Sequence, residues 1–467
     1  EENWASFKKI ITDLMNKHIP KYTPKSGNRK KNHIFDENVL KKIRKKHRAW
    51  QRFIETNDGE KYIEFCKIRN KVKTLIRKLK REHERKIAND SKSNPKAFWQ
   101  YTNSKLKTRS SIPDLEVDGQ EAKATTNPDK ANALNNFFSS VFTPVDTEDP
   151  PEIEKFTDEI LDSITINEDI VKEKLDKLKV SKSPGPDNLH PKLLYEVRLN
   201  ITEPLTLLFK QSIDTGMLPQ DWRDANISAI FKKGKRAKPN NYRPVSLTAI
   251  ICKLLESIIR DEIYNHLKSN KLFSNKQFGF LQGRSTTLQL LLTLDKWTKI
   301  LDEGGEIDIV YFDLMKAFDK VPHLKLQQKI EAYGITDKPS RWIKSFLSNR
   351  RQRVIVNGEI SDWTAVTSGV PQGSILGPIL FILYINDLPS KVNSNITLFA
   401  DDTKLYTNIN TDQDHLMLQD DIDSLVEWSN IWNLSFHPEK CKVMRIGSRN
   451  EELYNYSMNG KILNYTD

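Results

Sequence analysis

The chain has 467 residues, of which 37% are hydrophobic and 29% charged, enough for two or three domains with sizeable cores. Its longest apolar run, residues 379–385, is too short to span a bilayer, so we expect no membrane partner. The three cysteines lie far apart in the sequence, which disfavours a disulfide framework and a zinc site. They predict a reducing compartment, the nucleus or the cytoplasm.

The charge is unevenly distributed along the chain. Residues 1–110 hold 31 Lys/Arg and 12 Asp/Glu, a net charge of +19, and the remainder carries −7. From Phe35 to Ala88 the apolar residues follow helical spacing, with a break near Asn57–Gly59 that predicts an antiparallel helical pair. A polyanion such as nucleic acid is the expected partner of this basic helical extension, and a solvated helical face is the alternative.

The middle of the chain predicts a linker and then a mixture of helices and strands. Residues 111–160 are poor in pattern and contain one expected helix at 128–141, followed by an acidic, Pro-containing stretch. Further on, Asn357-Gly358 is a strong signal for a hairpin turn. We expect strands at 225–234, 242–247 and 354–360, and helices at 171–178, 250–267, 286–301, 321–333 and 341–347.

Three carboxylates are placed where they could cooperate. Residues 395–409 alternate like a hairpin whose tip carries Asp401 and Asp402, and the apolar run 307–312 ends on Asp313. An ordinary turn would explain an isolated Asp-Asp pair. If the two strands are neighbours, however, the three charges repel one another, and two Mg²⁺ ions, or Mn²⁺, would relieve that repulsion and clamp a phosphoryl displacement.

Three motifs resemble those of a known family. Residues 311–321 read YFDLMKAFDKV, residues 369–381 read GVPQGSILGPILF, and residues 399–402 read FADD. In this order and spacing they resemble the reverse transcriptases of jockey-type non-LTR retrotransposons. Related motifs extend from about residue 180 to residue 447.

This resemblance implies an α+β, right-hand polymerase with an antiparallel palm sheet backed by helices. Fingers and palm would occupy residues 161–449, with core motifs at 225–447, behind the basic helical extension at 1–110. Residues 450–467 read as an incipient hairpin leading to a thumb that we expect to be missing. The chain begins without methionine, so its N-terminus looks like a cut.

The resemblance also assigns roles to residues of this chain. The catalytic and metal-binding set would be Asp313, Asp401 and Asp402, with Lys440 as a candidate general acid for pyrophosphate. Phe318 would disfavour ribonucleotides by blocking a 2′-hydroxyl, and Asp319 would serve structure at a helix start. The candidates for nucleotide binding are Lys232, Lys233, Arg243, Phe318, Gln372 and Gly373. Template and phosphate contacts are expected from Lys182, Arg284, Arg350, Arg351 and Arg353.

The predicted function is therefore RNA-directed DNA polymerisation. A primer 3′-hydroxyl attacks a deoxynucleoside triphosphate on an RNA template, and positioning and electrostatics supply most of the catalysis. The alternative is a nucleic-acid-binding remnant that has kept the fold without turnover, suggested by the expected loss of the thumb and of an upstream endonuclease. An all-carboxylate nuclease is a third possibility, which residues 369–381 and Phe318 do not favour.

Overall fold

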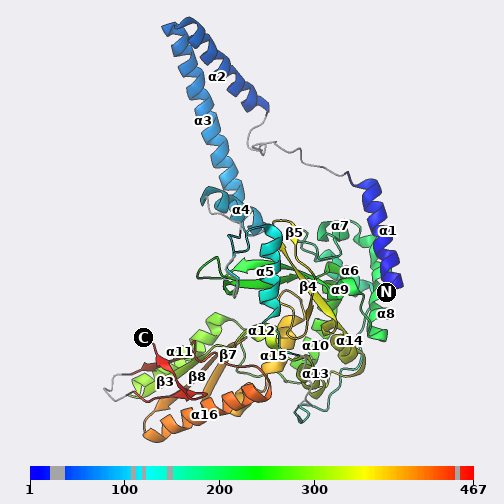
Figure 1. Ribbon diagram of the computed structural model, residues 1–467, viewed down its shortest axis with the longest axis vertical. Helices are drawn as coiled ribbons and strands as arrows, with labels where there is room; N and C mark the ends of the chain where they lie inside the picture. Colours follow the sequence, from blue (N-terminus) through cyan, green and yellow to red (C-terminus); the bar gives the residue numbers. More distant parts are fainter. Residues whose placement is uncertain (21–36, 107–111, 118–122, 145–150, 448–452, 467) are drawn as a thin grey trace. The chain divides into compact units, whose positions relative to one another are not determined.

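The structure, a computed structural model, describes residues 1–20, 37–106, 112–117, 123–144, 151–447 and 453–466 (Figure 1). The chain divides into two compact units, Ile10–Ser111 and a larger unit in which Glu1–Lys9 joins Ile112–Asp467. Within the ranges given above, no helix is long and apolar enough to cross a membrane. Part of the predicted acidic linker, at 145–150, lies outside the described residues.

The smaller unit is built on two long helices. Helices α2 (Glu37–Thr56) and α3 (Gly59–Asn89) pack along each other in opposite directions, and α4 (Pro95–Leu106) follows them (Figure 1). Asp58 lies in the turn and its side chain accepts a hydrogen bond from the backbone N–H of Glu60 at 2.9 Å, which caps α3. The turn therefore falls where the sequence predicts a break.

The first turns of the chain belong to the larger unit. Helix α1 (Glu2–His18) places Trp4 against Trp222 with ring centroids 5.3 Å apart. The Asp221 carboxylate accepts hydrogen bonds from the Trp4 indole at 2.9 Å and from Lys8 at 2.6 Å. These contacts attach Glu1–Lys9 to the larger unit.

One five-stranded sheet of the larger unit has the order β2-β1-β4-β5, with β6 beside β4. Strands β1 and β2, which match the predicted strands at 225–234 and 242–247, pair antiparallel, whereas β1 and β4 run parallel. Asn357 and Gly358, both with positive φ, make the predicted turn between β4 and β5. The strands are β1 (Ala225–Phe231), β2 (Tyr242–Leu247), β4 (Arg350–Val356), β5 (Glu359–Ile360) and β6 (Thr364–Val366), and α5 (Asn127–Ser139) packs on them.

Helices surround the two sheets. The predicted helix at 321–333 is present as α13 (His323–Ala332), which begins directly after Pro322. Helix α15 is buried along almost its whole length. The remaining helices are α6 (Glu168–Asp176), α7 (Pro191–Glu196), α8 (Arg198–Thr215), α9 (Gln220–Arg223), α10 (Ile250–Ser269), α11 (Thr286–Asp302), α12 (Ala317–Lys320), α13 (His323–Ala332), α14 (Asp337–Leu347), α15 (Gly377–Ile385) and α16 (Asp412–Ile431), with 3₁₀ turns at Pro239–Asn241 and Leu388–Lys391.

The second sheet carries the acidic motifs and has the order β12-β9-β3-β8-β7. Its inner pairs are antiparallel, as predicted, but the edge strand β12 runs parallel to β9. Helix α11 packs Trp297 against Ile307 and Ile309 of β3. The strands are β3 (Glu306–Phe312), β7 (Asn395–Phe399), β8 (Asp402–Ile409), β9 (Lys442–Ile446) and β12 (Asn464–Tyr465).

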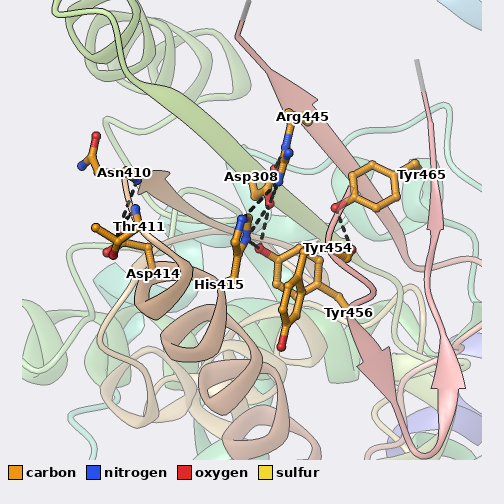
Figure 2. A network of polar contacts seen from close by, with 9 residues as sticks. All are labelled: Asp308, Asn410, Thr411, Asp414, His415, Arg445, Tyr454, Tyr456 and Tyr465. Carbon is orange, nitrogen blue, oxygen red and sulfur yellow. Dashed lines mark hydrogen bonds and ion pairs between the residues drawn. The ribbon is translucent and has the colours of Figure 1, made fainter. Parts of the chain in front are cut away.

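A buried charge lies in the middle of this sheet (Figure 2). Asp308 of β3 is fully buried and accepts two hydrogen bonds from Arg445 of β9, at 2.7 and 2.8 Å, and one from the Tyr456 hydroxyl at 2.7 Å. His415 of α16 contacts both the Asp308 carboxylate at 3.3 Å and the Tyr456 hydroxyl at 2.7 Å. The bond to Asp308 raises the pKa of Arg445. The network joins β3, β9 and α16 to the C-terminal segment.

The described C-terminal segment, residues 453–466, packs against the second sheet. The predicted hairpin is present as β10 (Ser457–Met458) and β11 (Lys461–Ile462). Strand β12 follows and adds an edge to the sheet, which the sequence did not predict. Residues 450–452 and 467 of the predicted range 450–467 lie outside the described residues.

Candidate active site

A tight turn carries two of the predicted aspartates. Ala400 and Asp401 connect β7 to β8, and Ala400 adopts a left-handed φ of 56°. The last residue of β3 pairs with the second residue of β8, so Asp313, which follows β3 directly, lies beside Asp402. The structure therefore brings Asp313, Asp401 and Asp402 to one edge of the sheet. Their catalytic roles stay predictions.

The three carboxyl groups influence one another electrostatically. Burial raises the pKa of Asp401, and the charge of Asp313 raises it further. Burial likewise raises the pKa of Asp402, and the charges of Asp401 and Asp313 add to the rise. Like charges held together in this way favour the protonated forms, which is the condition that a bound cation would relieve.

Asp313, Asp401 and Asp402 are the candidate ligands of a metal ion. Carboxylate oxygens are the ligands that Mg²⁺ prefers, and the mutual repulsion fits a cation at Asp313, Asp401 and Asp402. As their side chains stand, however, no three acidic, histidine or cysteine residues in the described part of the chain form a group that could hold a metal ion. The Lys440 amine lies 3.5 Å from the Asp313 carboxylate.

The segment that carries Lys440 is fixed to the strand end. The backbone N–H of His437 donates to the carbonyl of Asp313 at 2.8 Å, and the N–H of Asp313 points to the Cys441 sulfur at 3.5 Å. Residues 437–441 are therefore hydrogen-bonded to the backbone of Asp313. The side chain of Lys440 is half-exposed, and its role as a general acid stays a prediction.

Basic side chains of the β1–β2 hairpin face the acidic edge. The charges of Arg243 and Lys232 oppose the burial that raises the pKa of Asp401, so both lie within electrostatic reach of it. Lys233 is the next residue of the same exposed loop. Lys316, which the sequence analysis did not select, has a pKa lowered by burial and by nearby cations including Lys232.

The glycine-rich segment 369–373 docks on the turn after β3. The N–H of Val370 donates to the carbonyl of Phe318 at 2.7 Å. Gly369 has a φ of 87°, and a Cβ there would lie 2.6 Å from the Phe318 carbonyl oxygen. A residue with a side chain would therefore force the two segments apart.

Gln372 and Gly373 attach the same segment to β2. The N–H of Ser246 donates to the Gln372 carbonyl at 2.7 Å, and a Cβ on Gly373 would meet the Ser246 carbonyl oxygen at 2.5 Å. The side-chain amide of Gln372 donates to the Asp319 carboxylate at 2.9 Å. Burial raises the pKa of Asp319 to about 6. Asp319 thus serves structure, as expected, but by holding Gln372 rather than by capping a helix.

A small pocket of about 30 Å³ lies beside these residues, lined among others by Phe318, Asp319, Gln372 and Ser246. The Phe318 ring stacks on Phe381 with centroids 4.6 Å apart. The Phe318 ring is therefore held by α15. Its discriminating role stays a prediction.

The predicted phosphate contacts of β4 are only partly available. Arg350 is 2% exposed and donates to the Phe346 carbonyl at 2.9 Å, so the prediction for this residue is wrong. Arg351 forms a two-pronged pair with Asp224 at 2.7 and 3.0 Å, and Arg353 donates to an asparagine side chain at 2.8 Å. Strand alternation directs Arg350 to the opposite face from the other two.

Two further predictions concern loops. Arg284 donates to the backbone carbonyls of Ser274 and Gln277, so its guanidinium holds its own loop together instead of standing free for a template. Lys182 is exposed beside a Pro-Gly-Pro turn, and a Cβ on Gly185 would lie 2.6 Å from the Ala249 backbone. The role of Lys182 stays a prediction.

The sequence analysis missed the residue that fixes the carboxylate turn. The amide oxygen of Gln277 accepts from the N–H of Ala400 at 2.9 Å and from the N–H of Gly279 at 2.7 Å. Its amide nitrogen lies 3.3 Å from the Ala400 carbonyl oxygen. A Cβ on Gly279 would lie 2.3 Å from the Ala400 nitrogen.

The fold and the acidic sheet edge indicate the class of nucleotide polymerases. The chain belongs to the reverse transcriptase (RNA-dependent DNA polymerase) family, which it matches over residues 230–463. This finding confirms the resemblance seen in the motifs. The comparison with individual proteins points to the same group.

Several relatives are from Drosophila melanogaster. The chain is 29% identical over 317 residues to the RNA-directed DNA polymerase from mobile element jockey, covering 65% of this chain and 34% of that protein. It is 26% identical over 426 residues to the probable RNA-directed DNA polymerase from transposon BS, covering 85% and 46%. For the corresponding protein of transposon X-element the values are 27% over 364 residues, covering 74% and 39%. The chain thus spans less than half the length of these relatives.

Proposed function

We propose that this chain contains the fingers and palm of an RNA-directed DNA polymerase of a non-LTR retrotransposon. The observation that carries the proposal is the gathering of Asp313, Asp401 and Asp402 at one sheet edge, where burial and the neighbouring carboxylate charges raise the pKa values of the last two. The family match and the names of the relatives support it. Its three cysteines are free, which suits the nucleus or cytoplasm.

The β1–β2 hairpin would be part of the fingers and the second sheet would be the palm. Lys232 and Arg243 bind the triphosphate, because they are the hairpin cations within electrostatic reach of Asp401. Phe318, stacked on α15, lies against the sugar and excludes a 2′-hydroxyl. The template is RNA and the primer is DNA.

The reaction forms a bond from the primer 3′-oxygen to the α-phosphorus and breaks the bond to pyrophosphate. The three aspartates would hold two Mg²⁺ ions, which neutralise charge on the attacking and leaving oxygens. Lys440, beside Asp313, donates a proton to the departing pyrophosphate. The Gln372–Asp319 hydrogen bond keeps the glycine-rich segment against the nucleotide.

Extension of a DNA primer on an RNA template, with and without Mg²⁺, tests the proposal. We expect extension by the natural chain and none by Asp401→Asn. Asp420→Asn is the matched control, because it removes one charge from an exposed position of α16. Binding of primer-template without extension by any variant would instead indicate a chain that retains the fold without turnover.

A further inference from the structure

Helices α2 and α3 of the smaller unit carry a large excess of positive charge. Residues 37–89, which contain α2 and α3, hold 18 Lys/Arg and 7 Asp/Glu. Repulsion among so many cations opposes the packing of the two helices. Such a surplus is a cost to folding unless an anion offsets it.

Five of these cations surround one groove between the helices. The groove encloses about 350 Å³, and Val72 and Ile76 contribute its apolar lining. Among the residues that the structure describes, no acidic side chain lines the groove. The cations are Lys46 of α2 and Arg69, Lys73, Arg77 and Lys80 of α3.

The spacing of the α3 cations makes a continuous strip. At 3.6 residues per turn, positions 69, 73, 77 and 80 fall within about a quarter of the helix circumference. At 1.5 Å per residue, the strip from Arg69 to Lys80 is about 16 Å long. One nucleic-acid strand places a phosphate every 3.4 Å of helix axis, so the strip could face roughly five of them.

The positive charges of these five side chains are not offset by carboxylates of the described residues. Among the described residues, none of the five forms an ion pair with a carboxylate, whereas Lys41 pairs with Glu37 and Lys78 pairs with Glu82 away from the groove. The Arg69 guanidinium lies over the Phe65 ring at 5.7 Å, which orients it without cancelling its charge. The groove is thus a preformed, uncompensated cationic surface.

We propose that the α2–α3 groove binds the sugar-phosphate backbone of a nucleic acid as a second contact, separate from the polymerase site. Backbone phosphates, the groups that the excess of positive charge attracts, carry no sequence information, so we expect binding that is independent of sequence. RNA and DNA share the phosphodiester chemistry that the groove recognises. The proposal does not depend on the function of the acidic sheet edge.

Two triple variants of the full chain test it. Arg69→Gln/Lys73→Gln/Lys80→Gln removes three charges from the strip. Lys67→Gln/Lys71→Gln/Lys78→Gln removes three from exposed positions about 180° away on the same helix. Both carry Asp401→Asn, so that no turnover occurs, and circular dichroism checks that the helices are intact. Binding to a 30-base-pair RNA duplex and to a DNA duplex of equal length is measured at several salt concentrations.

We expect the groove variant to bind both duplexes at least about tenfold more weakly at 100 mM salt, and its salt slope to fall by about two to three. The opposite-face variant should change little. Equal losses in the two variants would overturn the proposal, because they would show a diffuse charge effect. Loss of binding to anionic lipid vesicles with duplex binding unchanged would also overturn it. A Lys73→Arg variant, which keeps the charge, should bind like the natural chain.

The outcome is distinguishable from failure of the proposed polymerase. A chain without extension activity whose groove variant still loses duplex binding would support the groove alone. An active polymerase whose two triple variants bind duplexes equally well would reject the groove and leave the polymerase standing. The binding measurement therefore decides this inference by itself.

Discussion

Two aspartates of the same stretch of chain meet opposite surroundings. Asp308, inside β3, has both carboxylate oxygens bound by Arg445 and a further bond from Tyr456. Asp313, just beyond the end of the strand, has Lys440 at 3.5 Å, and its own charge raises the pKa values of its neighbours. One carboxylate is fully satisfied by the protein and the other is left with excess negative charge around it.

The difference in surroundings separates a charge that stabilises the sheet from one for which we propose a function. A buried carboxylate costs stability unless hydrogen bonds and a counter-charge offset its desolvation, and Asp308 has both. A cluster of repelling carboxylates at an edge is instead poised for a ligand that the protein does not provide. Substituting each residue in turn therefore should damage different properties.

The largest effect is expected at the edge. Asp313→Asn should lower the rate of primer extension by at least about a thousandfold, because several kcal/mol of charge stabilisation in the transition state are lost. The melting temperature should change little, since the side chain is half-exposed. Single-turnover extension and a thermal melt measure the two quantities. If Asp313→Asn unfolded, the contrast between Asp313 and the stabilising Asp308 would be contradicted.

At Asp308, inside the sheet, we expect the main effect of substitution to be on stability. Asp308→Asn should destabilise the fold by about 3 kcal/mol, because Arg445 is left buried without its counter-charge. Denaturant unfolding measures this loss. The double variant Asp308→Leu/Arg445→Met should recover much of it, and a double variant as unstable as the single one would show that the pair is not the cause.

An intermediate effect is expected where the turn is held. Gln277→Ala should lower kcat about tenfold with a smaller change in KM. The backbone N–H and carbonyl of Ala400 lose their side-chain partner, and Asp401 and Asp402 shift as a result. Gln419→Ala is the control, since Gln419 similarly binds the N–H and carbonyl of Ser457, at 2.9 and 3.0 Å, on the C-terminal hairpin. Equal effects of both substitutions on kcat would contradict a positioning role.

The sequence predicted those features whose cause is local. Alternation and turn residues located the hairpins that contain Asn357-Gly358 and Asp401, and helical spacing located α10 and α11. The Asp308 network was not predictable, because Arg445 and Tyr456 are more than 130 residues away and nothing in a mostly apolar run announces a paired charge. Pairing between residues this far apart in the sequence is visible only in the structure.

The site was predicted unevenly for the same reason. The three aspartates follow from strand ends and a turn, which are visible in the sequence. The arginines of β4 were treated as one group, although strand alternation already separates Arg350 from Arg351 and Arg353. Gln277 is 123 residues before Ala400 in the sequence, and no local pattern predicted the contact between them.

The smallest effect concerns stability at the carboxylate turn. The pKa of Asp401 is raised above 3.8, so the folded state keeps a proton that the unfolded chain releases. Stability therefore falls as the pH rises from 3.8 through the raised value, and the loss persists at neutral pH. Asp401→Asn removes this loss, and we expect a gain of at most about 1 kcal/mol at pH 7.5, because solvent screens the charges.

Thermal melts from pH 4 to pH 8 would show the gain as a flatter pH profile in the variant. Added Mg²⁺ should raise the melting temperature of the natural chain, because a ligand that binds only the folded state stabilises it, and should have a weaker effect on Asp401→Asn. Asp420→Asn should behave like the natural chain in both measurements. If Mg²⁺ stabilised all three proteins equally, the excess charge at Asp313 and Asp401 would not be what attracts the ion, and the contrast with Asp308 would be one of burial alone.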